Sequence, residues 1–423
     1  VFQQVFGIKE LWGIDFFWIA AIGLVVLTAL YTIFGGMKSV LYTSVLQTPI
    51  LLLGSLIILV LGFKELGGWD EMMRVCGAVT VNDYGDTMTN LIRSNDDANF
   101  PWLGALIGSA IIGFWYWCTD QFIVQRVLSG KNEMEARRGT IFGAYLKLLP
   151  VFLFLIPGMI AFALHQKYIG AGGEGFLPML ENGTANADAA FPTLVAKLLP
   201  AGVKGLVVCG ILAALMSSLA SLFNSSAMLF TIDFYKRFRP QTSEKKLVGI
   251  GQVATVVIVI LGILWIPIMR SVGDVLYTYL QDVQSVLAPG IAAAFLLGIC
   301  WKRTSAQGGM WGLISGMVIG LTRLGAKVYY SNAGEVADST FKYLFYDMNW
   351  LFFCGWMFLF CIIVVIVVSL ATEAPTAEKI QGLVFGTATK EQKASTRASW
   401  NHWDIIHTVI ILAITGAFYW YFW

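Results

Sequence analysis

A run of hydroxyl side chains inside an apolar segment is the first feature that could do chemistry. Within residues 211–226, Ala214, Ser217, Ser218 and Ser221 are spaced i, i+3, i+4 and i+7, so they share one helix face. Sodium suits neutral oxygens, following the oxygen preference of hard cations. The same stripe is typical of small residues that let membrane helices pack closely. Spacing alone leaves both interpretations open.

An aromatic run is the second candidate. Residues 113–121 read Gly-Phe-Trp-Tyr-Trp-Cys-Thr-Asp-Gln. Glycine followed by polar residues at depth is typical of a helix broken around a binding site. Trp115, Tyr116 and Trp117 could stack on an amphipathic ligand such as a sugar ring. The alternative is an aromatic belt, although belts lie near the membrane interface and this run lies deeper.

Lys147 and Gln281 are the third candidate. Each is predicted to lie about 12 Å into its segment, Lys147 from the cytoplasmic end and Gln281 from the outer end. They are therefore expected to meet near the midplane. Lys147 could instead snorkel to the interface, and Gln281 could join helices. The adjacent Asp282 points about 100° away from Gln281, and we expect it to pair elsewhere or to face water.

The segments that carry these side chains have the composition of membrane helices. The chain has 423 residues, 57% apolar and 13% charged, whereas soluble domains carry about 25% charged residues. This composition argues against a soluble enzyme and a disordered protein, and a net charge of +2 offers no field for nucleic acid. No metal-ligand or nucleophile–base pattern joins the three histidines, so we predict no enzyme.

Ten segments are long and apolar enough to cross a bilayer, which takes about 20 residues. The predicted spans are 14–34, 40–63, 101–128, 140–165, 203–234, 247–269, 274–300, 308–324, 350–371 and 403–423. Basic residues are concentrated in alternate loops, beginning with the one that holds Lys38. Positive loops favour the cytoplasm, which predicts a multi-pass cell-membrane protein with both ends of this chain outside.

Several phrases closely resemble the sodium–solute symporter family, in its sodium/glucose cotransporter branch. They are Tyr31-Thr-Ile-Phe-Gly-Gly36, Trp115-Tyr-Trp-Cys-Thr-Asp-Gln-Phe-Ile-Val-Gln-Arg126, Tyr145-Leu-Lys-Leu-Leu-Pro150, Phe230-Thr-Ile-Asp-Phe-Tyr-Lys236 and Leu297-Gly-Ile-Cys-Trp-Lys-Arg303. The resemblance implies an all-α membrane fold with a five-plus-five inverted repeat. Residues 1–423 would be one transmembrane domain holding the last two helices of the first repeat, the whole second repeat and three trailing helices. The leading helices would be missing.

The resemblance also implies ligands for several residues. The carbonyl of Ala214 and the hydroxyls of Ser217 and Ser218 match the family's sodium site. Lys147 and Gln281 match its sugar-binding lysine and glutamine.

At the inner gate, Tyr116 matches the family's gating tyrosine, and Trp117 lies beside it. Gly113 occupies a position that often carries Asn or Thr in the family, which predicts one sugar hydrogen bond fewer. Family members that bind two sodium ions use an Asp, a Thr and a Ser for the second ion. Here Ser44 and Ala220 replace the Asp and the Thr, and only Ser221 remains. We therefore predict one sodium per sugar.

The predicted function is sodium-driven symport of a hexose-like sugar by alternating access. Myo-inositol or another polyol is an alternative solute, and a sugar sensor that does not transport is an alternative function. The expected partners are sodium, the sugar and the lipid bilayer, with no nucleic acid and no obligate protein partner.

Overall fold

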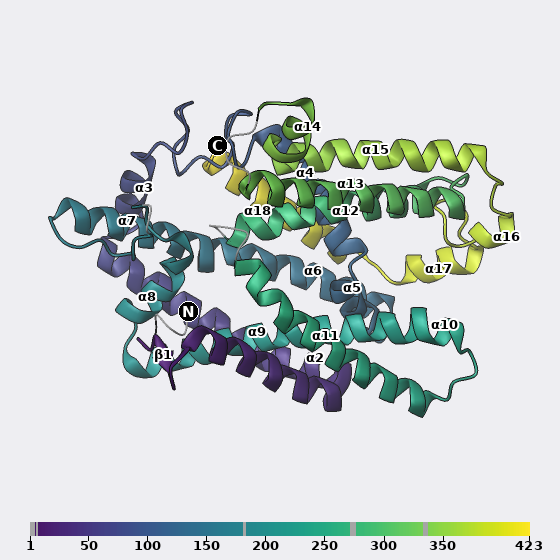
Figure 1. The fold of residues 1–423 in the computed structure, drawn as a ribbon, viewed down its shortest axis with the longest axis horizontal. Coiled ribbons are helices and arrows are strands. Elements are labelled where there is room, and N and C mark those ends of the chain that lie inside the picture. The colour runs from purple at the N-terminus through teal and green to yellow at the C-terminus, as the bar shows by residue number, and fades with distance from the viewer. Residues whose placement is uncertain (1–4, 6, 181–182, 271–275, 333–336) are drawn as a thin grey trace. The chain divides into compact units, whose positions relative to one another are not determined.

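The structure is a computed structural model that describes residue 5 and residues 7–180, 183–270, 276–332 and 337–423. The backbone is almost entirely helical (Figure 1). The chain divides into two compact units. The first comprises Val1–Val79, Thr87–Thr89 and Leu146–Gly273, and the second comprises Thr80–Asp86, Asn90–Tyr145 and Asp274–Trp423.

The first unit contains a two-stranded antiparallel sheet followed by helices. Its elements are β1 (Glu10–Leu11), β2 (Ile14–Asp15), α2 (Phe16–Leu66), α3 (Trp69–Gly77), the π-helix η1 (Val151–Leu155), α7 (Ile156–Gly170), the 3₁₀-helix η2 (Ala187–Ala189), α8 (Ala190–Leu198), α9 (Ala201–Leu229), the π-helix η3 (Phe230–Tyr235), α10 (Lys236–Phe238) and α11 (Glu244–Arg270).

Helix α2 differs from the prediction. Its 51 residues correspond to about 77 Å at 1.5 Å per residue, more than twice the hydrocarbon thickness of about 30 Å. Two apolar segments within it, Phe16–Ile33 and Gln47–Leu66, each qualify as a span. The loop predicted around Lys38 is wrong, because the backbone there is helical. Gly35 and Gly36 lower helix propensity by about 1 kcal/mol each, which the apolar segments on either side outweigh.

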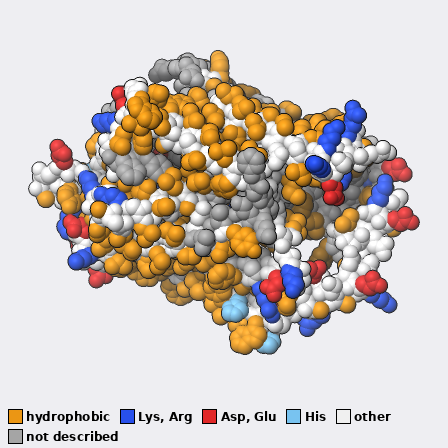
Figure 2. Space-filling model, turned by 90° about the horizontal axis from the view of Figure 1, so that it is seen from below, with side chains coloured by type: hydrophobic (Ala, Val, Ile, Leu, Met, Phe, Trp, Pro, Cys, Tyr) orange, Lys and Arg blue, Asp and Glu red, His pale blue; other side chains and the backbone are white. Residues whose placement is uncertain are grey.

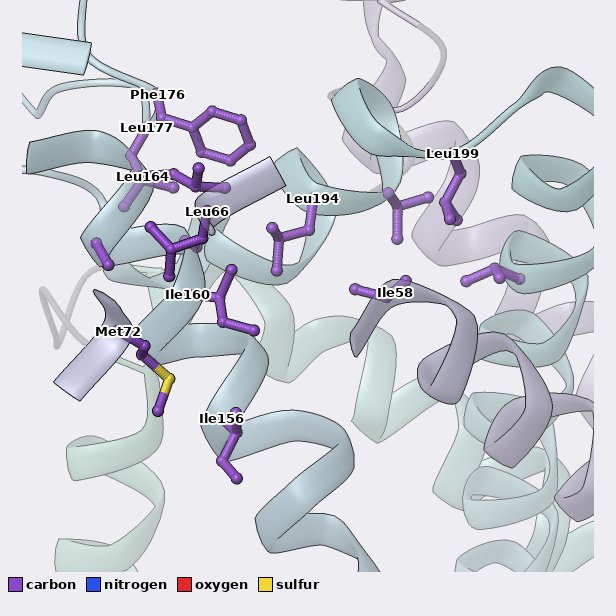
Figure 3. Packing of buried hydrophobic residues seen from close by; sticks show 14 of the residues in the cluster. Ile58, Leu66, Met72, Ile156, Ile160, Leu164, Phe176, Leu177, Leu194 and Leu199 are labelled. Atoms are coloured by element: carbon purple, nitrogen blue, oxygen red, sulfur yellow. The ribbon is translucent and has the colours of Figure 1, made fainter. Parts of the chain in front are cut away.

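The largest hydrophobic core of the first unit lies where α2 meets α7, α8 and α9 (Figure 3). Ile58, Ile160, Leu164 and Leu194 are all fully buried. A β-carbon added at Gly62 would lie 3.1 Å from the Ile160 side chain. The helices therefore approach closely at a small residue, as is typical of membrane helix pairs.

The second unit is built around α12 (Leu276–Cys300) and α15 (Trp350–Ala371), which pack against each other and each against both α4 (Trp102–Cys118) and α13 (Ala306–Asn332). Its other elements are α5 (Gln121–Leu128), α6 (Glu133–Pro150, whose last turns belong to the first unit), α14 (Thr340–Lys342), the π-helix η4 (Tyr343–Asp347), α16 (Ala377–Ile380), α17 (Lys390–Ala398) and α18 (His402–Tyr421).

Glycines set the spacing of α13 from its neighbours. A β-carbon at Gly320 would lie 2.7 Å from the Val286 carbonyl oxygen of α12, and one at Gly316 would lie 3.0 Å from the Gly290 α-carbon. These glycines also explain why α13 falls below the hydropathy expected of a span, since glycine supplies no apolar side chain. The predicted span 308–324 is nevertheless helical throughout.

Eight helices of the described residues are long and apolar enough to cross a membrane, or nine if the bent pair α4–α5 is one span. Ten were predicted, so the count, the inverted repeat and the orientation of the ends remain predictions. Figure 2 shows hydrophobic side chains over much of the visible surface. Soluble monomers rarely expose large apolar patches, and this surface fits contact with lipid.

The polar segment 64–100, which separates two of the predicted spans, contains the short helix α3 and an ordered acidic residue. Asp97 is only 5% exposed and accepts hydrogen bonds from the backbone N–H groups of Asn99 (2.9 Å) and Phe100 (2.7 Å). Burial acts to raise the pKa of Asp97, but these bonds, with Asn82 and Arg93, lower it overall.

Candidate functional site

The three predicted sodium ligands lie on adjacent turns of α9, but their environments differ. Ser217 is 8% exposed, Ala214 is half-buried and Ser218 is exposed. Ser221 is fully buried, and its hydroxyl donates to the Ser217 carbonyl oxygen at 2.9 Å. The stripe is therefore divided between a buried side, with Ser217 and Ser221, and an exposed side, with Ser218.

The buried side of the stripe continues a close contact between α9 and α2. A β-carbon at Gly210 would lie 3.4 Å from the Leu51 backbone, and one at Gly54 would lie 2.7 Å from Val207. Residues 207, 210, 217 and 221 recur at helical spacing on one face of α9. These contacts support the packing interpretation for Ser217 and Ser221. The sodium interpretation remains a prediction and depends most on Ser218.

A cavity that the sequence did not suggest lies at the C-terminal end of α9. It has a volume of about 280 Å³ and is formed by α2, the end of α9, η3 and α11. Five neutral polar side chains line it: Thr32, Asn224, Thr231, Gln252 and Thr255. The three threonine hydroxyls donate to carbonyls of their own helices at 2.7–2.9 Å. Their oxygens therefore offer the cavity acceptor lone pairs.

Asn224 connects this cavity to the serine stripe. It follows Ser217 by seven residues, so both lie on one side of α9 two turns apart. The signal in the sequence was the continuation of the stripe into Asn-Ser-Ser at 224–226. The partners from α2 and α11 had no comparable signal, because their proximity depends on tertiary packing.

The helix that carries the aromatic run is broken, as the glycine followed by polar residues indicated. Helix α4 ends at Cys118, and α5 begins at Gln121 with a bend of 47°. The Thr119 hydroxyl donates to the Trp115 carbonyl oxygen at 2.7 Å, and the Asp120 carboxylate accepts from the Phe122 N–H at 3.0 Å. These two polar side chains satisfy backbone groups that the break exposes.

The aromatic pair lies just before this break. Tyr116 is half-buried and Trp117 is 49% exposed, and their rings meet edge to face with centroids 5.3 Å apart. Gly113 lies within α4, and a β-carbon there would meet no atom within 4 Å. The β-carbon position at Gly113 is therefore open within the described residues, and the lost sugar hydrogen bond stays a prediction.

Lys147 and Gln281 belong to different units, so their predicted meeting at the midplane remains a prediction. Lys147 is exposed on the last turn of α6, ahead of Pro150 and η1. Gln281 is half-buried on α12. Asp282 pairs elsewhere, as predicted: its carboxylate binds Lys327 and lies 3.6 Å from the Arg323 guanidinium, both on α13.

Residues 5–316 match the family model of the sodium:solute symporter family. The chain belongs to this family. It is 36% identical to human sodium/myo-inositol cotransporter 2 over 381 residues, which are 88% of this chain and 56% of that protein. It is 38% identical to sodium/glucose cotransporter 1 of Ovis aries, over 88% of this chain and 58% of that protein.

The sodium/mannose cotransporter of Bos taurus is 35% identical over 96% of this chain and 72% of its own length. A solved structure of a Na⁺-coupled sialic acid symporter, in a substrate-bound outward-open state, has a TM-score of 0.65 and 21% identity. It covers 89% of this chain and 71% of the symporter chain, and it shows the fold alone. The chain therefore spans a little over half the length of the inositol and glucose cotransporters.

The family resemblance read from the sequence is thus confirmed. The relatives named above are cotransporters, in agreement with the prediction that the chain is not an enzyme. Sodium, the predicted ion, appears in the name of each.

Proposed function

We propose that the protein is a sodium-coupled symporter of a hexose or a closely related polyol. The observation that carries this proposal is its 35–38% identity to cotransporters named for glucose, mannose and myo-inositol. All three solutes are six-carbon molecules rich in hydroxyls. A site for them needs an aromatic surface and a few hydrogen-bonding side chains, and Tyr116, Trp117, Lys147 and Gln281 would supply these.

In the proposed mechanism, sodium binds the Ala214 carbonyl and the hydroxyls of Ser217 and Ser218. Binding raises the population of the outward-open state that accepts sugar, and the coupling is reciprocal, so sugar also strengthens sodium binding. A potential of 100 mV adds about 2.3 kcal/mol per charge carried inward. Tyr116 would act as the inner lid.

We also propose that the acceptor-lined cavity at Asn224 and Gln252 lies on the route by which sodium leaves the site. Its neutral oxygens would replace part of the ion's hydration shell without holding the ion tightly. Asn224 lies two turns from Ser217 on the same side of α9, and Ser221 lies between them.

One sodium per sugar is the stoichiometry that the residues favour. A second sodium needs an oxygen-rich site and preferably a negative charge, because two cations repel strongly in low dielectric. Ala220 is buried and has no side-chain oxygen, and the Ser221 proton is engaged by the Ser217 carbonyl. Asp282 forms ion pairs with Lys327 and Arg323, so its charge is already balanced. Ser44 lies in α2, but its side chain is outside the described residues.

The test is uptake of radiolabelled glucose, mannose and myo-inositol by the full-length protein in proteoliposomes. An inward sodium gradient is compared with an equal choline gradient. We expect accumulation above equilibrium with sodium only, and mutual competition among solutes that share the site. Equilibration without accumulation would contradict coupling. Accumulation of myo-inositol that hexoses fail to inhibit would favour the polyol.

A further inference from the structure

The second unit contains a buried charge cluster that the proposed transport mechanism does not use. It consists of Asp282 on α12 and of Arg323 and Lys327 on α13, and we call it the Asp282 cluster. The carboxylate binds the Lys327 ammonium directly, and its second oxygen lies 3.6 Å from the Arg323 guanidinium. The side chain of Arg323 is fully buried, and those of Asp282 and Lys327 are 13% and 30% exposed.

Arg323 connects the cluster to the rest of the helix bundle. Its guanidinium donates to the Met348 carbonyl oxygen at 2.8 Å, in the turn between η4 and α15. Its central carbon lies 4.1 Å from the centroid of the Phe353 ring on α15, which is a cation–π contact. One arginine therefore joins α13 to α15, while the same guanidinium faces Asp282 on α12.

A buried charge cluster of this kind adds little to the stability of the folded protein. Desolvating buried charges costs about as much as their attraction returns, and well-packed apolar residues often replace them without loss. Buried ionic groups can instead specify one arrangement, with helix register as the best-attested case. Charged residues inside membrane segments are also markers of function by default.

The relative rotation of α12 and α13 is weakly determined by their other contacts. Its close approach is made by Gly290 against Gly316 and by Gly320 against Val286. A glycine seam brings two backbones together but offers few interlocking side chains, so it resists rotation of one helix against the other weakly. The Asp282 cluster supplies a fixed direction for α12 at one end of this seam.

Gln281, the proposed sugar ligand, immediately precedes Asp282. In a helix, neighbouring side chains differ by about 100° in direction and 1.5 Å along the axis. The contacts of Asp282 with α13 fix the direction of its side chain. They therefore also fix the direction of the neighbouring Gln281. We propose that Asp282, held by Lys327 and Arg323, is a positioning residue that sets the rotation of α12 so that Gln281 meets the sugar. This inference rests on the proposed function of Gln281.

The first experiment preserves the charge of the cluster while removing its geometry. The original cluster has two positive charges and one negative, a net of +1, and Asp282→Asn combined with Lys327→Met also leaves +1. We expect the KM for sugar uptake to rise about tenfold, since small misplacements of a binding group can cost up to about 100-fold. The half-saturating sodium concentration and the maximal rate should change less than about twofold.

The second experiment asks whether this effect passes through Gln281. In a Gln281→Ala background, the double substitution should raise KM no further, because the residue that it misplaces is already absent. Asp338→Asn is the matched control. It removes a carboxylate from an exposed Lys342 pair of 2.8 Å in the same unit, and sugar KM should not change.

The outcomes separate the two claims. If Gln281→Ala raises sugar KM and the charge-matched variant does not, positioning is wrong and the proposed sugar contact stands. Additive effects of the two changes would also overturn positioning. If Gln281→Ala leaves sugar KM unchanged, the proposed sugar contact fails, and the positioning role fails with it. Thermal unfolding of each purified variant distinguishes a folding defect, which would lower the amount of active protein rather than raise KM.

Discussion

The serine stripe of α9 and the Asp282 cluster of α12 and α13 place polar groups inside apolar helices in opposite ways. On α9 the groups are neutral, and Ser221 satisfies its proton within its own helix, on the Ser217 carbonyl. In the Asp282 cluster the groups are charged, and their partners lie on other helices. Neutral hydroxyls that need no partner from another helix keep lone pairs available for a cation, whereas buried charges hold helices in one arrangement.

Replacing Arg323 should have the largest effect. It tests whether the buried charges of the Asp282 cluster hold the helices together. Replacing Arg323 with Met leaves the Met348 carbonyl without its 2.8 Å partner and removes one of the two cations that face Asp282. Breaking a buried ion pair from one side costs about 3–5 kcal/mol. We expect Arg323→Met to lower the unfolding temperature and the yield of folded protein strongly, and Lys327→Met, at a more exposed position, to do so less. Equal stability of the two variants would contradict the central place of Arg323.

Replacing Ser218 tests whether the hydroxyls of α9 bind a cation. Ser218 suits this test because it is exposed and contributes little to packing. Removing a hydroxyl that binds a charged group costs about 1.5–3 kcal/mol, roughly tenfold or more in affinity. Ser218→Ala should therefore raise the half-saturating sodium concentration at least about tenfold without changing thermal stability. Ser221→Ala, one turn further along the same stripe, should leave sodium dependence unchanged. Unchanged sodium dependence of uptake in Ser218→Ala would remove the sodium assignment.

Gly113 gives a smaller effect and sharpens the description of the sugar site. A β-carbon added there would meet no neighbouring atom within 4 Å among the described residues. One added hydrogen bond is worth about 1 kcal/mol, or roughly fivefold in affinity. Gly113→Asn should lower sugar KM by about that factor, and Gly113→Ala, which fills space without a hydrogen bond, should not. An equal change in both variants would point to packing instead.

Asp97 gives the smallest effect and concerns the ordered polar segment outside the helices. Because its pKa is lowered in the folded protein, its contribution to stability is present above the unfolded-state pKa of about 3.9. It is lost as the pH falls through the lower, folded-state pKa. Asp97→Asn should reduce the acid dependence of the unfolding temperature, while the exposed Asp338→Asn should leave it nearly unchanged. The same slope in Asp97→Asn and the parent would be inconsistent with this role.

The sequence was sufficient for features that depend on local pattern. Apolar length predicted most of the long apolar helices, and a glycine followed by polar residues within 113–121 indicated a broken helix. The side chains of Thr119 and Asp120 satisfy backbone groups at the break. The helical backbone around Lys38 was missed because charge and glycine suggested a loop. The free-energy cost of placing glycines and a charge in a helix was smaller than the stabilisation from the helical apolar segments on either side.

Features that depend on tertiary packing were beyond the sequence. Arg323 and Lys327 follow Asp282 by 41 and 45 residues, and the packing of α12 against α13 brings them together. The cavity at Asn224 likewise needs side chains from α2 and α11. Its threonines gave no separate signal, because hydroxyls bound to their own helix look the same in sequence whether they line a cavity or face lipid.

We propose that one sodium ion drives each sugar molecule across the membrane, and this stoichiometry can be measured. The most direct measurement is the reversal potential of sugar-dependent current in proteoliposomes holding the full-length protein, as the sodium and sugar gradients are varied independently. A one-to-one ratio is predicted, and Asp282→Asn should leave that ratio unchanged. A ratio of two would contradict the assignment and would require a second site beyond Ser221 and Asp282. A reversal potential independent of the sodium gradient would contradict sodium coupling itself.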